Sequence, residues 1–279
     1  MFIKPFWQAS AIWCLLLLTL LGGCGGSQQY VTLARDGASY SGSVAALSER
    51  ASALRVESSS YALLQQRREL TKKYKGTALK KATGNSFRQT TQSDLGAIES
   101  NLKTREVALF LRDYFVVLQE LAASTAPVDI GENTSEIIEK LDGAMGTKKV
   151  SSIPLPPSIA PGIVSHITDG VLRKELNGRK KSILSALDIL ERLLGALGRE
   201  IDGQTKSIRN ARVALLIQPA FQDTTSVSLA SLSDKELWVT LRQKEVLGSI
   251  AEKDDREAIA AAKTSGRKFR EFFIKITGE

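Results

Sequence analysis

Apolar residues recur every three or four positions along most of the chain, which is the spacing of one face of an α-helix. The longest pattern lies between residues 183 and 215, where two positions of a seven-residue repeat are apolar. These positions hold Ile183, Leu187, Leu190, Leu194, Leu197, Ile201, Ile208, Ala211 and Leu215. Because only Gln204 interrupts this seam, the pattern predicts a long helix that packs lengthwise against other helices.

Two long helices are predicted before this seam. The first carries an apolar stripe made of Tyr40, Val44, Leu47, Ala51, Leu54, Ser58 and Tyr61, which continues through Leu64 and Leu70 towards Tyr74. Two glycines, Gly76 and Gly84, mark the turn that we expect after it.

The second helix is predicted from about Ser86 to Ala123. Its first half would face the core through Leu95, Ile98 and Leu102. Its second half contains residues 106–121, with the sequence EVALFLRDYFVVLQEL, which are apolar around much of the helix circumference. This segment is the best candidate for the centre of the core.

Shorter signals complete the predicted architecture. The runs that open at Asn133 and Ser233 each have a glutamate three residues later, which is typical of a helix start. They predict one short helix and a last long helix that continues to about Lys275. Four prolines in residues 151–162 predict an extended connection. We therefore expect an all-α protein, an elongated antiparallel bundle of about four long helices plus one short helix.

The amino end has the pattern of a secretory signal peptide. Lys4 precedes an apolar run over residues 11–21, which is too short to span a bilayer, and two glycines follow. The sequence Leu21-Gly22-Gly23-Cys24 resembles the lipobox of bacterial lipoproteins. This resemblance implies cleavage after Gly23, acylation of Cys24 with groups such as palmitate, and attachment to a membrane.

The resemblance also implies an address and a domain plan. Gly25 stands where an aspartate usually retains such proteins at the inner membrane, so we expect a periplasm-facing outer-membrane lipoprotein in a Gram-negative host. Residues 1–23 would be the signal peptide. Residues 24–43 are rich in Gly, Ser and Gln and are expected to form a lipidated flexible tether. Residues 44–279 would form the helical bundle domain.

The charge of the chain is uneven. With 38 basic and 30 acidic residues, its formal net charge is +8. One basic cluster consists of Arg67, Arg68, Lys72, Lys73, Lys75, Lys80 and Lys81, with Glu69 as the single acid among them. In an exported protein these cations would meet an anionic wall polymer, lipid head groups or an acidic envelope protein, and no nucleic acid. The alternative is a solvated helix end whose cations complement the helix dipole.

Candidate catalytic and metal-binding residues are few. His166 is the only histidine, Cys14 would leave with the signal peptide, and Cys24 would carry lipid. We therefore predict no Cys/His metal site, no cofactor and no enzymatic activity. Three glycines within the heptad region, Gly195, Gly198 and Gly203, lack the Lys-Ser/Thr ending of a phosphate loop. They are expected to allow close approach of a neighbouring helix.

These patterns leave three functional hypotheses. The first is a membrane-anchored structural or interaction protein, a scaffold or tether whose basic end lies away from the membrane and contacts an anionic partner. The second is a helical subunit that assembles through the seam over residues 183–215. The third is an enzyme or small-ligand carrier with a site between the helices.

Overall fold

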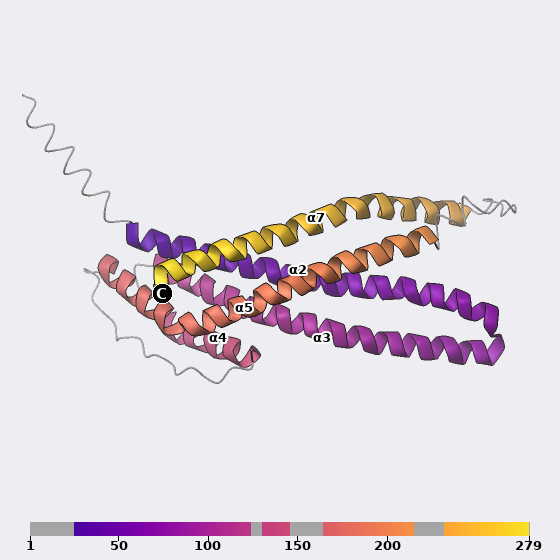
Figure 1. The fold of residues 1–279 in the computed structure, drawn as a ribbon, viewed down its shortest axis with the longest axis horizontal. Helices are drawn as coiled ribbons and strands as arrows, with labels where there is room; N and C mark the ends of the chain where they lie inside the picture. Colours follow the sequence, from indigo (N-terminus) through magenta and orange to yellow (C-terminus); the bar gives the residue numbers. More distant parts are fainter. Residues whose placement is uncertain (1–24, 124–129, 146–163, 215–231, 279) are drawn as a thin grey trace, which may run out of the picture. The chain divides into compact units, whose positions relative to one another are not determined.

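The computed structural model describes residues 25–123, 130–145, 164–214 and 232–278. These residues form five helices and no strand: α2 (Gly25–Lys73), α3 (Gly76–Ala123), α4 (Ile130–Ala144), α5 (Val164–Arg212) and α7 (Leu232–Thr277) (Figure 1). The predicted all-α fold, with four long helices and one short helix, is confirmed. None of these described helices has an apolar stretch long enough to cross a bilayer.

The chain divides into two compact units. Of the described residues, the first comprises 25–39, 110–123, 130–145, 164–184 and 269–278, and the second comprises 40–109, 185–214 and 232–268. Each long helix contributes residues to both units, whereas α4 belongs to the first unit alone.

Aromatic rings form the centre of the first unit. The ring of Phe115 packs edge-on against Tyr114 at 5.3 Å between centroids and against Phe269 at 5.0 Å. Tyr114 and Phe115 are fully buried, and so are Leu111 and Leu118 of the same helix. The prediction that residues 106–121 hold the centre of the core is therefore confirmed for the part of this segment that lies in the first unit.

The predicted flexible tether over residues 24–43 is wrong for its described residues. Residues from Gly25 onwards are the start of α2, and Tyr30, Leu33 and Ala34 are buried in the first unit. The Gly and Ser content that suggested flexibility has a packing role at Gly37, where an added Cβ would lie 2.6 Å from the ring of Phe115. This segment, rich in small residues, is thus part of a packed helix, and its Gly37 lets an aromatic ring approach the backbone.

Ion pairs define the helix directions in the second unit. Arg55 of α2 pairs with Asp94 of α3 at 2.8 Å, while Glu49, earlier in α2, pairs with Arg105, later in α3. These two helices are therefore antiparallel. The same order holds between α5 and α7, where Asp202 pairs with Arg256 and Arg212 lies near Glu245.

The heptad seam of α5 is buried within one chain. In the second unit, Leu187, Leu190, Leu194, Leu197, Ile201 and Ile208 are all at most 4% exposed. Of the three glycines in this region, Gly198 fits the expectation of close helix approach, because an added Cβ would lie 3.1 Å from Ile259 of α7. Gly195 and Gly203 do not fit it, since no described atom of another helix lies within 4 Å of such a Cβ.

The predicted inner face of α3 is wrong at Leu95 and Leu102, while its third member, Ile98, is half-buried. Leu95 and Leu102 are 62% and 52% exposed, whereas the preceding residues Asp94 and Asn101 are 8% and 6% exposed. The apolar stripe of α2 also ends earlier than predicted: its members up to Ser58 are buried, but Leu64 is exposed and so is Tyr74. In this part of the second unit, the side chains that are buried are therefore not the ones that the apolar pattern of the sequence predicts.

The turn between α2 and α3 is shorter than predicted. α3 begins at Gly76, whose φ of 57° suits glycine, and Gly84 lies inside this helix. α4 likewise begins at Ile130, so Asn133 is not its cap. The predicted signal peptide with Cys24, the proline-rich connection over residues 151–162, and Leu215 lie outside the described residues.

Candidate functional site: a basic helical hairpin

The most highly charged part of the chain is the end of α2, the turn and the start of α3. We call residues 58–93 the basic hairpin (Figure 1). It contains eight basic residues, the seven of the predicted cluster and Arg88, and one acidic residue, Glu69. Its net charge is therefore +7, so the rest of the chain, whose total is +8, is nearly neutral.

The structure brings the seven predicted cations together around one turn and exposes all of them. Arg67, Arg68, Lys72, Lys73, Lys75, Lys80 and Lys81 are each exposed. Lys72 pairs with Glu69 at 2.8 Å, and its hydrogen bond lowers the pKa of that carboxyl group. The other six form no ion pair with any described residue. This part of the surface therefore has a large uncompensated positive charge.

Helix capping accounts for only part of this charge. Lys72 and Lys73 lie in the last turn of α2, where cations are favoured by the helix dipole. Lys75 directly precedes α3, and Lys80 and Lys81 follow its first turn, which contains no acidic residue. Cations are disfavoured at this positive end of a helix. Lys75 is thus placed unfavourably with respect to the dipole of α3, and Lys80 and Lys81 gain nothing from it.

Large apolar side chains are also exposed on the basic hairpin. Leu64 is 54% exposed, Tyr74 is 45% exposed, and Phe87 is 61% exposed. Tyr74 lies in the turn itself, between Lys73 and Lys75. The surface therefore combines positive charge with apolar area that is in contact with water. A helix end whose cations serve only to keep it solvated does not require such apolar area.

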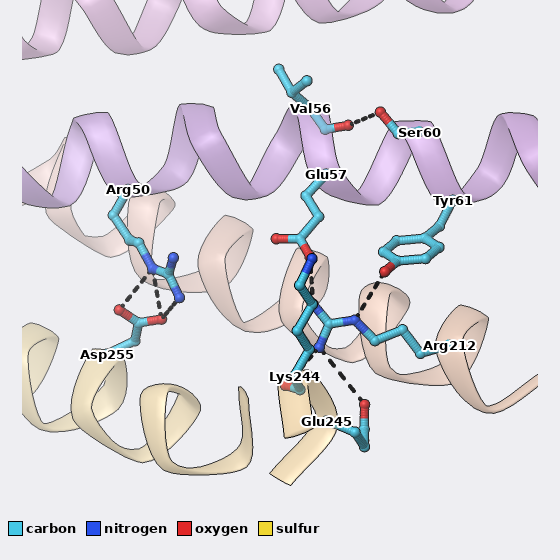
Figure 2. Close-up of polar contacts among 9 residues, drawn as sticks. All are labelled: Arg50, Val56, Glu57, Ser60, Tyr61, Arg212, Lys244, Glu245 and Asp255. Atoms are coloured by element: carbon cyan, nitrogen blue, oxygen red, sulfur yellow. Dashed lines mark hydrogen bonds and ion pairs between the residues drawn. The ribbon is translucent and has the colours of Figure 1, made fainter. Parts of the chain in front are cut away.

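A second polar cluster surrounds Arg212 at the end of α5. Figure 2 shows its guanidinium between Glu57 and Tyr61 of α2 and Lys244 and Glu245 of α7. It donates hydrogen bonds to the Tyr61 hydroxyl at 3.2 Å, to the Lys244 carbonyl at 3.1 Å and to the Glu57 carboxylate. Burial lowers the pKa of this guanidinium, but the hydrogen bonds to Tyr61 and Glu57 outweigh burial and raise it.

This cluster is a cross-link between helices and a poor site for an anion. The charge of Arg212 is already compensated, and Arg50 is similarly held by Asp255 at 3.0 Å (Figure 2). The cavity beside them has a volume of about 50 Å³, which suits water and excludes larger ligands.

An open hollow lies where the basic hairpin begins. It has a volume of about 380 Å³ and is lined by Arg55, Ser58, Ser59, Ala62, Gln89, Thr90, Ser93, Asp94 and Gln204. Its size is that of a small-ligand site, but no aromatic side chain lines it. Its one cation, Arg55, is paired with Asp94, so the hollow has weak means of holding an anion.

Three ionisable groups are buried together in the first unit. Glu175 and Arg179, one turn apart on α5, form an ion pair at 3.2 Å with side chains 4% and 2% exposed. Burial, and then the negative charge of Glu175, raise the pKa of Tyr114 well above its usual value near 10. The Tyr114 hydroxyl has no hydrogen-bond partner among the described residues.

The buried tyrosine predicts a pH dependence of stability. Tyr114 stays protonated in the folded chain above pH 10.0, where an unfolded tyrosine ionises. The contribution of the protonated Tyr114 phenol to the free energy of unfolding is complete below pH 10.0. As the pH rises above this value, the contribution is lost by about 1.4 kcal/mol per pH unit. Tyr114→Phe should leave urea stability at pH 7 unchanged or about 1 kcal/mol higher, and should reduce the alkaline loss.

Urea unfolding of both proteins on either side of pH 10 measures this difference. Tyr74→Phe, at an exposed tyrosine, serves as the control and should retain the full alkaline loss. Equal losses in Tyr114→Phe and the parent protein would show that the phenol is not held protonated.

The remaining predicted site residues are less informative. Cys24 and the side chain of His166 lie outside what the structure describes. In the described parts of the chain, no three His, Cys, Asp or Glu side chains gather to hold a metal ion. Comparison with family models, curated proteins and solved structures finds no match to this chain.

Proposed function

We propose that this protein is a membrane-anchored scaffold or tether of the bacterial envelope, held by lipid at Cys24, whose basic hairpin binds an anionic partner. The observation that carries the proposal is the concentration of a +7 charge on one exposed hairpin of a chain whose total charge is +8. Six of its cations have no ion-pair partner among the described residues, so they are available to bind an anion.

The architecture of α2 supports this function. The predicted lipid site, Cys24, directly precedes the first residue of a helix, so the anchor would be attached to a rigid element. Within the second unit, residues 40–73 of α2 correspond to about 50 Å of helix that leads to the basic turn. A long helix with a charged turn is suited to making a contact and not to enclosing a substrate.

Assembly through the seam over residues 183–215 has less support. Its described apolar side chains are already covered within one chain, so an intermolecular contact there would first have to expose them. The basic hairpin is the better candidate for a contact surface because it is exposed without rearrangement.

Photo-crosslinking in intact cells tests the proposal. A photoreactive residue at the exposed position Thr77, in the first turn of α3, should give an adduct with an envelope component. Changing Lys72, Lys73, Lys75, Lys80 and Lys81 to Gln should reduce the adduct about tenfold or more. Cys24→Ser should move the chain from the membrane fraction to the soluble fraction.

Two controls make the outcome specific. The same photoreactive residue at Ala261, an exposed position on α7, should not give that adduct. Changing five exposed lysines elsewhere in the second unit, Lys103, Lys206, Lys253, Lys263 and Lys268, lowers the net charge equally and should leave the adduct intact. An adduct that survives in the hairpin variant, or a Cys24→Ser chain that stays with the membrane, contradicts the proposal.

A further inference from the structure

In the middle of α3, polar side chains are buried and large apolar side chains are exposed. At two positions seven residues apart, a polar residue is buried and the leucine after it is exposed: Asp94 before Leu95, and Asn101 before Leu102. Asp94 is compensated by Arg55, but the side-chain amide nitrogen of Asn101 has no hydrogen-bond partner among the described residues. Burying such a group costs free energy, and exposing two leucines forgoes the gain from their burial. Stability of the isolated chain does not explain this arrangement.

The exposed apolar residues share a face of α3 with the cations of the basic hairpin. At 100° per residue, Phe87, Leu95 and Leu102 lie within about 80° around the helix axis. Lys80, Lys81 and Arg88 fall on the same face, and the six positions together span about 120°. All six side chains are exposed. On this exposed face of α3 the cations lie towards the turn and the leucines lie further along the helix, where two exposed acids, Glu99 and Glu106, fall on the same arc.

We propose that the basic hairpin and this outer face of α3 bind the surface of an anionic phospholipid bilayer. This inference rests on the proposed function and specifies its partner. A helix with cations and large apolar residues on one exposed face binds the interface of such a bilayer, where phosphates meet the cations and acyl chains receive the apolar groups. Clusters of four to eight Lys and Arg residues are typical of surfaces that recognise anionic lipids.

Two details favour a bilayer over a wall polymer or an acidic protein. The six cations without an ion-pair partner are on exposed side chains that no described residue holds in place. The phosphates of a fluid bilayer can move to meet such cations in any arrangement. Tyr74 lies between two lysines in the turn and is 45% exposed. Tyrosine is enriched at the level of lipid head groups, where its ring is shielded and its hydroxyl stays hydrated. A hydrated polymer would bind the cations but leave Phe87 and the leucines in water.

Vesicle co-sedimentation tests this inference. The protein is the chain from residue 24 onwards with Cys24→Ser, which lacks lipid but retains every residue that the structure describes. It should bind vesicles of equal parts phosphatidylcholine and phosphatidylglycerol, with affinity about tenfold or more above that for phosphatidylcholine alone. Raising the salt concentration should weaken this binding because it screens the cations.

Two sets of variants separate charge from apolar contact. Changing Lys72, Lys73, Lys75, Lys80 and Lys81 to Gln should weaken binding about tenfold or more. Changing Phe87, Leu95 and Leu102 to Gln should weaken it several-fold without altering the net charge. The matched apolar control changes Val246, Leu247 and Ile250, which are exposed on α7, to Gln and should bind as the parent does. The matched charge control is the set of five lysines used above.

The possible results are distinct. Loss of binding in both hairpin sets, with both controls unchanged, supports the inference. Absence of binding to anionic vesicles overturns it, and so does equal weakening by the control sets. If vesicles do not bind but the Thr77 crosslink in cells joins a wall polymer or an acidic protein, the proposed function stands and the lipid partner is wrong. If neither assay detects a contact, both proposals fail.

Discussion

Replacing Arg179 by leucine should lower the free energy of unfolding by about 3 to 5 kcal/mol, one of the two largest effects that we expect. The Arg179 guanidinium is 2% exposed and pairs with Glu175, whose side chain is 4% exposed. Removing the cation leaves the Glu175 carboxylate buried and without its ion-pair partner. An unpaired buried charge is costly because neither water nor a partner compensates its lost hydration. Urea unfolding at neutral pH measures the change.

A double variant separates the pair from simple loss of packing. Changing Glu175 and Arg179 together to leucine removes both charges, so it should recover much of the stability that Arg179→Leu loses. Arg173→Leu, at an exposed position on the same helix, is the control and should change stability by less than about 0.5 kcal/mol. If the double variant loses as much as the sum of both single variants, the two residues are not coupled as the structure implies.

The parts of the fold that could be predicted are those where local pattern and tertiary burial agree. The heptads of α5 and the dense apolar run over residues 106–121 are buried as expected, because so many apolar positions leave no other face to bury. The basic cluster was also predictable, since charges this numerous remain in contact with water in nearly any fold.

The errors arise where a partner far away in sequence decides the outcome. Asp94 is buried because Arg55, 39 residues earlier, meets it across the hairpin, and no periodicity within α3 contains that information. The predicted tether is packed in the first unit at Gly37, which receives the ring of Phe115 from another helix. The small side chains of this segment predict flexibility from composition. In the structure, the same lack of side-chain volume lets the ring approach the helix backbone.

For the candidate site, sequence located the cations but missed the apolar half of the surface. Helical periodicity predicts that Leu95 and Leu102 lie in the core, because it identifies an apolar face without showing which way that face points. The only signal that could have warned of the inversion is the polar residue beside each leucine, Asp94 and Asn101. Such a pair is ambiguous until the buried side of the helix is known.

Phe115→Ala is the second change with a large expected effect, a loss of about 3 to 5 kcal/mol in the free energy of unfolding. The ring is fully buried, packs edge-on against Tyr114 and Phe269, and occupies the space beside the backbone of Gly37. Its removal leaves a cavity bounded by other aromatic side chains and by α2. Chemical denaturation followed by circular dichroism measures the loss.

The presence or absence of the Phe115 ring should decide whether Gly37→Ala lowers or raises the free energy of unfolding. In the parent chain, Gly37→Ala places a methyl group 2.6 Å from the Phe115 ring, and such overpacking costs about 1 to 3 kcal/mol. In the Phe115→Ala background the obstruction is gone, so alanine should stabilise the helix by up to about 1 kcal/mol.

Gly170→Ala supplies the matched control for this reversal. Gly170 lies in α5, and no described atom beyond its own helix turn comes within 4 Å of an added methyl group. Alanine there should therefore stabilise both backgrounds alike, by up to about 1 kcal/mol. If Gly37→Ala stabilises the parent chain as Gly170→Ala does, then the ring does not lie against α2, and the glycine in this helix has no packing role.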